Sequence, residues 1–85
     1  MKKHNDNFIS ATLKTDLLLS DYTHSEDPHE KDSILEIMSR YIYDMNSKVS
    51  LMYSKICDSN EKDKEIYVEI LMDLIADCKA EIEVA

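Results

Sequence analysis

The stretch "LEIMSRYIYDMNSKVSLMYSKI" (residues 35–56) sets the expected fold, because its apolar residues recur at alternating steps of three and four. Such steps have a mean period of 3.5 residues, the period of helices that pack side by side in coiled coils and bundles. The pattern continues through three heptads and therefore predicts one long helix with an apolar seam. The seam consists of Leu35, Met38, Ile42, Met45, Val49, Met52 and Ile56.

A second long helix is expected over residues 60–83, with Asp58 or Ser59 as its N-cap. Its apolar face is wider than the seam, which is typical of a helix that packs against more than one neighbour. Because its connection to the preceding helix is short, the two helices should run antiparallel. The core members expected on this helix are Tyr67, Leu71 and Leu74.

Upstream of the seam, apolar residues at four-residue steps predict a short helix over residues 8–19. A polar tail (1–7), expected to fray, precedes this helix. A polar segment (20–27) follows it and is expected to be a linker.

The end of the expected linker carries the most specific local signal in the chain. Asp27, Pro28 and Glu30 stand in the order of N-cap, first helical position and capping-box acid. The long helix of the seam is therefore expected to occupy residues 28–57.

Composition supports an all-α fold in one domain, residues 1–85. The chain has no Gly and one Pro, whereas β-rich folds use both residues in their turns, and 44% of its residues are hydrophobic. We expect a short N-terminal helix followed by a long antiparallel helical hairpin. Such a hairpin leaves part of its apolar surface uncovered, so a second copy is expected to complete a helical bundle as a homodimer.

A row of acids runs along the expected last helix at steps of four residues, the spacing of neighbours on a helix surface. Each like-charged pair costs a helix about 0.2–0.5 kcal/mol. Residues 58–85 carry nine acids and three lysines, so the row has few cations of its own. It is either a solvated outer face or the binding surface for a protein partner, possibly a basic one. We call it the acidic ladder: Glu65, Glu69, Asp73, Asp77 and Glu81.

Tyr43 is a second candidate for partner binding, or else part of an ordinary solvated stripe. An exposed tyrosine is a common interface anchor, and small serines beside it permit close approach of another helix. The serines expected to share its helix are Ser39, Ser47, Ser50 and Ser54.

No motif for catalysis, for a cofactor or for a metal is found, so an enzyme is not expected. His24 and His29 lie in or beside the linker at spacings that match no zinc or calcium motif. Cys57 and Cys78 should lie about 28 Å apart along antiparallel helices, too far for a disulfide. Two reduced cysteines suit the cytoplasm. No signal peptide and no membrane-spanning stretch is recognised.

A net charge of −8 disfavours binding to nucleic acids and to anionic membranes. Arg40, Lys48 and Lys55 would share the second helix but form only a weak basic patch. RNA or DNA is therefore not an expected partner.

Three stretches resemble the AriR family of biofilm-development proteins, small helical connectors of enteric two-component signalling. They are "ILEIMSRYIYD" (34–44), "NSKVSLMYSKI" (46–56) and "EKDKEIYVEILMDLI" (61–75). The resemblance covers about half of the chain and implies a non-enzymatic dimer that regulates by binding a response regulator or repressor.

Two further resemblances are architectural. The pair "SRYIYDMNSK" (39–48) and "EILMDLIADC" (69–78) is similar to the hairpin of Rop-type RNA-binding proteins. Size, charge and hairpin form are also similar to those of small type III secretion chaperones. The function predicted first is that of a small acidic regulator or adaptor, with a secretion-type chaperone or an RNA-binding hairpin as alternatives.

Overall fold

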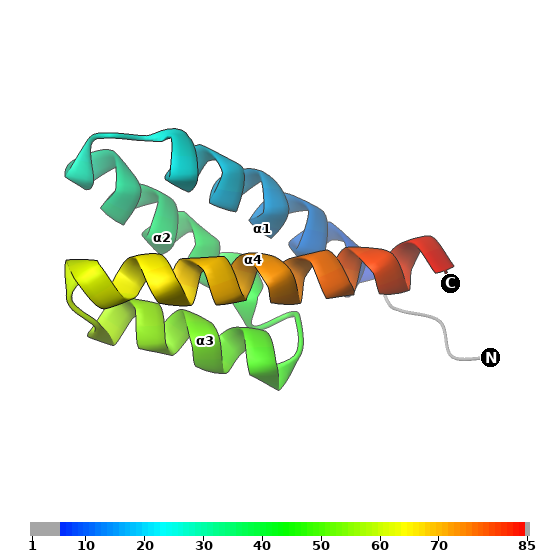
Figure 1. The fold of residues 1–85 in the computed structure, drawn as a ribbon. Coiled ribbons are helices and arrows are strands. Elements are labelled where there is room, and N and C mark those ends of the chain that lie inside the picture. Colours follow the sequence, from blue (N-terminus) through cyan, green and yellow to red (C-terminus); the bar gives the residue numbers. More distant parts are fainter. Residues whose placement is uncertain (1–5, 85) are drawn as a thin grey trace.

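Four helices form the part of the chain that the structure, a computed structural model, describes: residues 6–84 (Figure 1). The all-α prediction is confirmed. The helices run alternately up and down in a bundle of 42 × 18 × 18 Å, with α1–α2 and α3–α4 as antiparallel pairs. They are α1 (Asp6–His24), α2 (Pro28–Ile42), α3 (Ser47–Asp58) and α4 (Glu61–Val84).

Helix α4 spans most of the length of the bundle, because its 24 residues extend about 36 Å at 1.5 Å per residue. It packs against α1 on one side and α3 on the other (Figure 1). This arrangement accounts for its wide apolar face. Its buried residues are Val68, Leu71, Ile75 and Cys78.

The prediction of one helix over residues 28–57 is wrong, and with it the prediction of a short helix plus a long hairpin. The chain leaves the helix after Ile42 and turns through residues 43–46. The side chain of Asn46 then accepts a hydrogen bond of 3.0 Å from the backbone N–H of Val49 and begins α3. Asn, Asp and Ser side chains compete for backbone groups and favour helix ends, and three of them lie at positions 44, 46 and 47.

The residues of the apolar seam still face one core despite this break, because α2 and α3 both direct their seam residues into it. Five of its members are buried, whereas Met45 and Met52 are half-buried. From α4, Leu71 is buried and Tyr67 and Leu74 are half-buried against the cluster. The buried members of the seam are Leu35, Met38, Ile42, Val49 and Ile56.

Helix α1 is longer than predicted, since residues 20–24 belong to it and not to a linker. Leu19 and Tyr22 are buried three residues apart and carry the apolar face of α1 into its last turns. The connection to α2 is only residues 25–27. Of the tail predicted over residues 1–7, residues 1–5 lie outside the described part, and Asp6 and Asn7 are helical.

The predicted cap of α2 is present in part. Asp27 accepts a hydrogen bond of 3.0 Å from the N–H of His29, and Pro28 is the first helical residue. The N–H of Asp27 donates to the Ser25 hydroxyl at 3.3 Å. At α4 the capping side chain is neither Asp58 nor Ser59 but Asn60, which accepts from the N–H of Asp63 at 2.9 Å.

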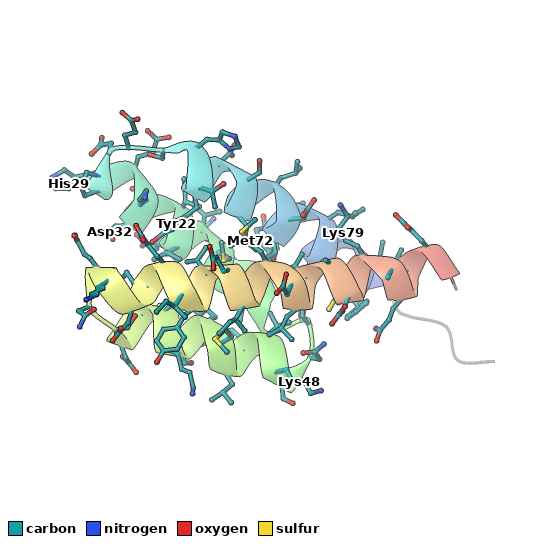
Figure 2. All side chains as sticks on the ribbon, in the orientation of Figure 1. Tyr22, His29, Asp32, Lys48, Met72 and Lys79 are labelled. Carbon is teal, nitrogen blue, oxygen red and sulfur yellow. The ribbon has the colours of Figure 1, made fainter. Side chains whose placement is uncertain are left out.

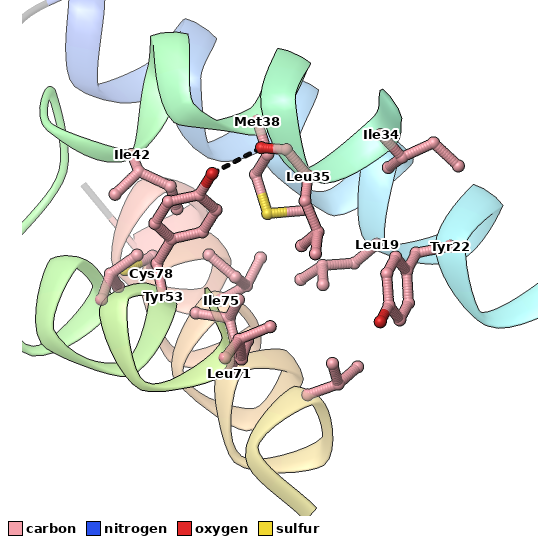
Figure 3. Packing of buried hydrophobic residues seen from close by; sticks show 13 residues of the cluster. Leu19, Tyr22, Ile34, Leu35, Met38, Ile42, Tyr53, Leu71, Ile75 and Cys78 are labelled. Atoms are coloured by element: carbon pink, nitrogen blue, oxygen red, sulfur yellow. Dashed lines mark hydrogen bonds between the residues drawn. The ribbon is translucent and has the colours of Figure 1, made fainter. Parts of the chain in front are cut away.

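Tyr53 joins α3 to α2. Among helices that follow each other in the chain, these two approach each other least closely. Its hydroxyl donates a buried hydrogen bond of 2.6 Å to the backbone carbonyl of Leu35 (Figure 3). Burial of the phenol raises the pKa of Tyr53 to about 12 from its ordinary value of about 10. The neutral hydroxyl is therefore part of the folded structure.

Replacing Asn46 by Ala should lower the free energy of unfolding by about 1 kcal/mol, because one helix-cap hydrogen bond is lost. Chemical denaturation monitored by circular dichroism measures this change. Ser54→Ala, at an exposed position of the same helix, should change it by less than about 0.5 kcal/mol. Equal effects of the two substitutions would contradict the assigned role of the cap.

Tyr53 should also make the fold sensitive to alkali. A folded pKa above the unfolded one means that its contribution is complete below about pH 10 and is lost as pH rises through about 12. Tyr53→Phe should cost about 1 kcal/mol at pH 7, because the hydrogen bond to Leu35 is lost, and should reduce the loss of stability between these pH values. Denaturation curves at pH 7 and at alkaline pH test this, with the exposed Tyr43→Phe as control. An unchanged alkaline loss in Tyr53→Phe would contradict it.

Candidate functional site

The acidic ladder lies on the exposed surface of α4, and all five of its residues are exposed. Four-residue steps advance about 40° each, so the ladder sweeps about 160° around the helix. Within residues 6–84, no ion pair joins Glu65, Glu69, Asp73 or Asp77 to a cation. The ladder thus presents a broad acidic surface whose first four carboxylates are not neutralised by the described part of the chain.

Two isoleucines interrupt this acidic surface. Ile66 is 55% exposed and Ile70 is 38% exposed, four residues apart on the same helix. Glu69 and Asp73 follow them by three residues each, so the apolar pair and the acids are neighbours on one surface. Both isoleucines belong to a helix for which the sequence predicts a wide apolar face. Their exposure could not be predicted without knowing where α1 and α3 pack.

Two lysines, one of α3 and one of α4, are engaged in contacts away from the ladder. The ammonium of Lys55 lies 5.9 Å from the centre of the Tyr67 ring, a cation–π contact between α3 and α4. Lys79 of α4 forms an ion pair of 3.0 Å with Asp16 of α1. Figure 2 shows Lys79 on the α1 side of α4 and Lys48 at the start of α3.

The expected basic patch on a single helix does not exist. Arg40 belongs to α2, whereas Lys48 and Lys55 belong to α3, which begins after the turn. The three cations are therefore divided between two helices of opposite direction.

Tyr43 does not share a helix with its four predicted serines. It follows the last residue of α2 and is 71% exposed in the turn to α3. Ser39 lies on α2 and donates to the Glu36 carbonyl, while Ser47, Ser50 and Ser54 lie on α3. No hydrogen bond or ring contact of the described residues joins Tyr43 to the ladder. The two candidate surfaces are thus separate features of the molecule.

A cleft of about 310 Å³ opens where the α1–α2 and α3–α4 connections meet, a feature that sequence reasoning missed. Three separate segments line it, from the end of α1, the start of α2 and the start of α4. Glu65 is both the first residue of the ladder and part of this lining. The lining residues are Tyr22, Glu26, Pro28, Lys31, Asp32, Glu61, Lys64 and Glu65.

Both cysteines are free thiols in very different surroundings. Cys57 is exposed near the end of α3. Cys78 is buried in α4, where its sulfur accepts a hydrogen bond of 3.5 Å from the Asn46 amide. Burial, followed by the nearby Glu81 carboxylate, raises the pKa of Cys78. The buried thiol is thus a packing group, held protonated in the core.

Neither a metal site nor a membrane-spanning helix is found among residues 6–84. Among them, no three His, Cys, Asp or Glu side chains converge in a way that could hold a metal ion. No helix in this part of the chain combines the length and the apolar character needed to cross a membrane.

Comparison of the chain with models of protein families, with curated proteins and with solved structures gives no match. The resemblance to the AriR family therefore stays a prediction.

The two thiols should differ sharply in reactivity. A thiol reagent such as Ellman's reagent should modify one cysteine of the native chain and both cysteines in denaturant. Modification of Cys78 should be at least about a hundredfold slower than that of Cys57, because it requires opening of the core. Cys57→Ser should abolish the fast reaction and Cys78→Ser should leave it unchanged; two fast thiols in the native protein would contradict the burial of Cys78.

Proposed function

We propose that the protein is a small non-enzymatic regulator or adaptor that binds a basic segment of another protein through the exposed surface of α4. The observation that supports this most directly is the combination on that surface of unneutralised acids with Ile66 and Ile70. A solvated helix face has no need of an exposed apolar pair, although single exposed apolar residues are common. An apolar centre with a charged rim is the arrangement of protein interfaces.

The two components of this surface have different physical roles. Carboxylates attract a basic partner over several ångströms and fix its orientation, mainly by raising the association rate. Ile66 and Ile70 lose water on binding and so slow dissociation, at about 25 cal/mol for each Å² of apolar surface buried. Salt would weaken binding by this surface, since ions screen the attraction exerted by the carboxylates and do not screen the apolar contact of the isoleucines.

Action in the cytoplasm is part of the proposal and is compatible with two free thiols. A homodimer stays a prediction. It was expected because a two-helix hairpin leaves its core open, but here α1 and α2 cover that core within one chain. The regulator therefore needs no second copy in order to present α4.

A salt-resistant complex would favour the second candidate, a secretion-type chaperone. One observation supports that alternative: Leu51 of α3 is exposed in addition to the two isoleucines of α4. The RNA-binding alternative has less support, because the cations expected to form one patch are divided between α2 and α3.

Reversing two ladder charges tests the proposal. Immobilised full-length chain should retain a protein from native lysate that moderate salt releases, and Glu69→Lys/Asp73→Lys should reduce this retention at least about tenfold. Both positions are exposed, so helicity by circular dichroism should be unchanged. The matched control is Asp21→Lys/Glu36→Lys, which makes the same charge change at exposed positions of α1 and α2.

Retention by the control but not by the ladder variant supports binding through α4. Equal retention by both variants would mean that the ladder is only a solvated face. A partner that resists salt, and is lost on Ile66→Ser/Ile70→Ser instead, would favour the chaperone.

A further inference from the structure

The cleft at the end of the bundle is built around one buried aromatic side chain. Tyr22 is only 8% exposed and packs at the edge of the hydrophobic cluster beside Leu19 (Figure 3). Its hydroxyl makes no hydrogen bond with any described residue. The ring is buried, but the hydroxyl oxygen is not among the fully buried side-chain atoms that lack a partner in the described residues, so it reaches the surface of the cleft. This hydroxyl therefore offers an unused acceptor to whatever enters the cleft that Tyr22 lines.

The rim of the cleft is acidic, because its own lysines balance only part of its negative charge. Four carboxylates face two lysine ammonium groups, a net charge of −2, and none of the six forms an ion pair within residues 6–84. Figure 2 places Asp32 beside Tyr22, between α2 and the first turns of α4. Burial, with the negative charges of Asp32 and Glu61, raises the pKa of Tyr22. The phenol is thus a neutral group in a negative field.

The size of the cleft and the arrangement of its carboxylates restrict the kind of cation that fits. The four carboxylates do not converge as a metal site would, so a bare divalent ion is not the matching ligand. A volume of about 310 Å³ is at the small end of ligand sites and suits one side chain or a short linear molecule. The chain itself already places an ammonium group here, since that of Lys31 lies 5.1 Å from the centre of the Tyr22 ring.

We infer that this cleft binds an aliphatic ammonium group, carried by a lysine of a basic protein segment or by a free polyamine. An ammonium group has three donors, which can reach the Tyr22 hydroxyl and carboxylates of the rim at the same time. Its methylene stem would lie against the Tyr22 ring and Pro28.

For a protein source, the inference rests on the proposed function and deepens it. Glu65 belongs both to the acidic ladder and to the cleft, so the two surfaces are continuous. A basic segment that lies along α4 would reach the cleft at the N-terminal end of the helix and anchor one lysine there. The polyamine source does not depend on the proposed function.

Titration of the ¹⁵N-labelled full chain with tetralysine and with spermidine tests the inference at low salt. Amide shifts of Asp32 and Glu65 should report binding in the cleft. Tyr22→Phe keeps the ring and removes the acceptor, and should weaken binding about tenfold, the effect of losing a hydrogen bond to a charged group. Tyr41→Phe, at a tyrosine of α2 that does not line the cleft, should leave the affinity unchanged.

Lys31→Met should act in the opposite direction. It removes the internal ammonium group and one positive charge from the cleft, so the affinity should rise severalfold. General damage to the fold would weaken binding, and so cannot produce this gain.

The titrations also distinguish the two sources of the ammonium group. Tighter binding of tetralysine, with shifts that continue along α4, supports a protein segment; equal or tighter binding of spermidine, with shifts confined to the cleft, supports a polyamine. Equal affinity of Tyr22→Phe and wild type for both probes, or shifts spread evenly over all acids, would overturn the inference. If partner retention is lost in Glu69→Lys/Asp73→Lys while Tyr22→Phe binds both probes like wild type, the inference fails and the proposed function stands.

Discussion

The side chain of Asn46 imposes the constraint on which the bundle depends. It accepts a hydrogen bond from the N–H of Val49 and donates one to the sulfur of Cys78, so it starts α3 and ties that start to α4. Because the chain reverses here, α3 and α4 return along α1 and α2 and close one core from a single chain. The hydrogen bond from Tyr53 to the Leu35 carbonyl then joins the two halves through α2 and α3, whose backbones approach less closely than those of α1 and α4.

Three of the seven lysines within residues 6–84 lie over aromatic rings of the same bundle. Lys14, Lys31 and Lys55 lie over Tyr41, Tyr22 and Tyr67, at 5.0, 5.1 and 5.9 Å from the ring centres. An ammonium group placed over a ring leaves carboxylates elsewhere without a partner. The uneven surface charge of the molecule therefore results from its internal contacts as well as from its composition. The excess of acids lies on the exposed side of α4.

Sequence reasoning recovered what depends on local spacing and missed what depends on packing. The helical class, the last helix and the cap at Asp27 could be predicted, because periodicity and capping residues are local signals. The turn before Asn46 was missed, because a 3.5-residue period looks the same in one helix and in two helices that face one core. The ladder was visible on a single helix. The cleft was not, because Tyr22 was assigned to a linker and its other walls come from distant segments.

The continuity of the seam across residues 43–46 has a consequence for stoichiometry. Leu35 to Ile42 and Val49 to Ile56 keep one heptad register, so an uninterrupted helix would direct the same apolar residues to one side. Such a helix would separate the α1–α2 half from the α3–α4 half, and two chains would then have to exchange halves to bury the same surface. The same apolar residues could be buried in either arrangement, by a turn within one chain or by an exchange of halves between two chains. The polar cap at Asn46, rather than the core, favours the path in which α3 turns back along the same chain.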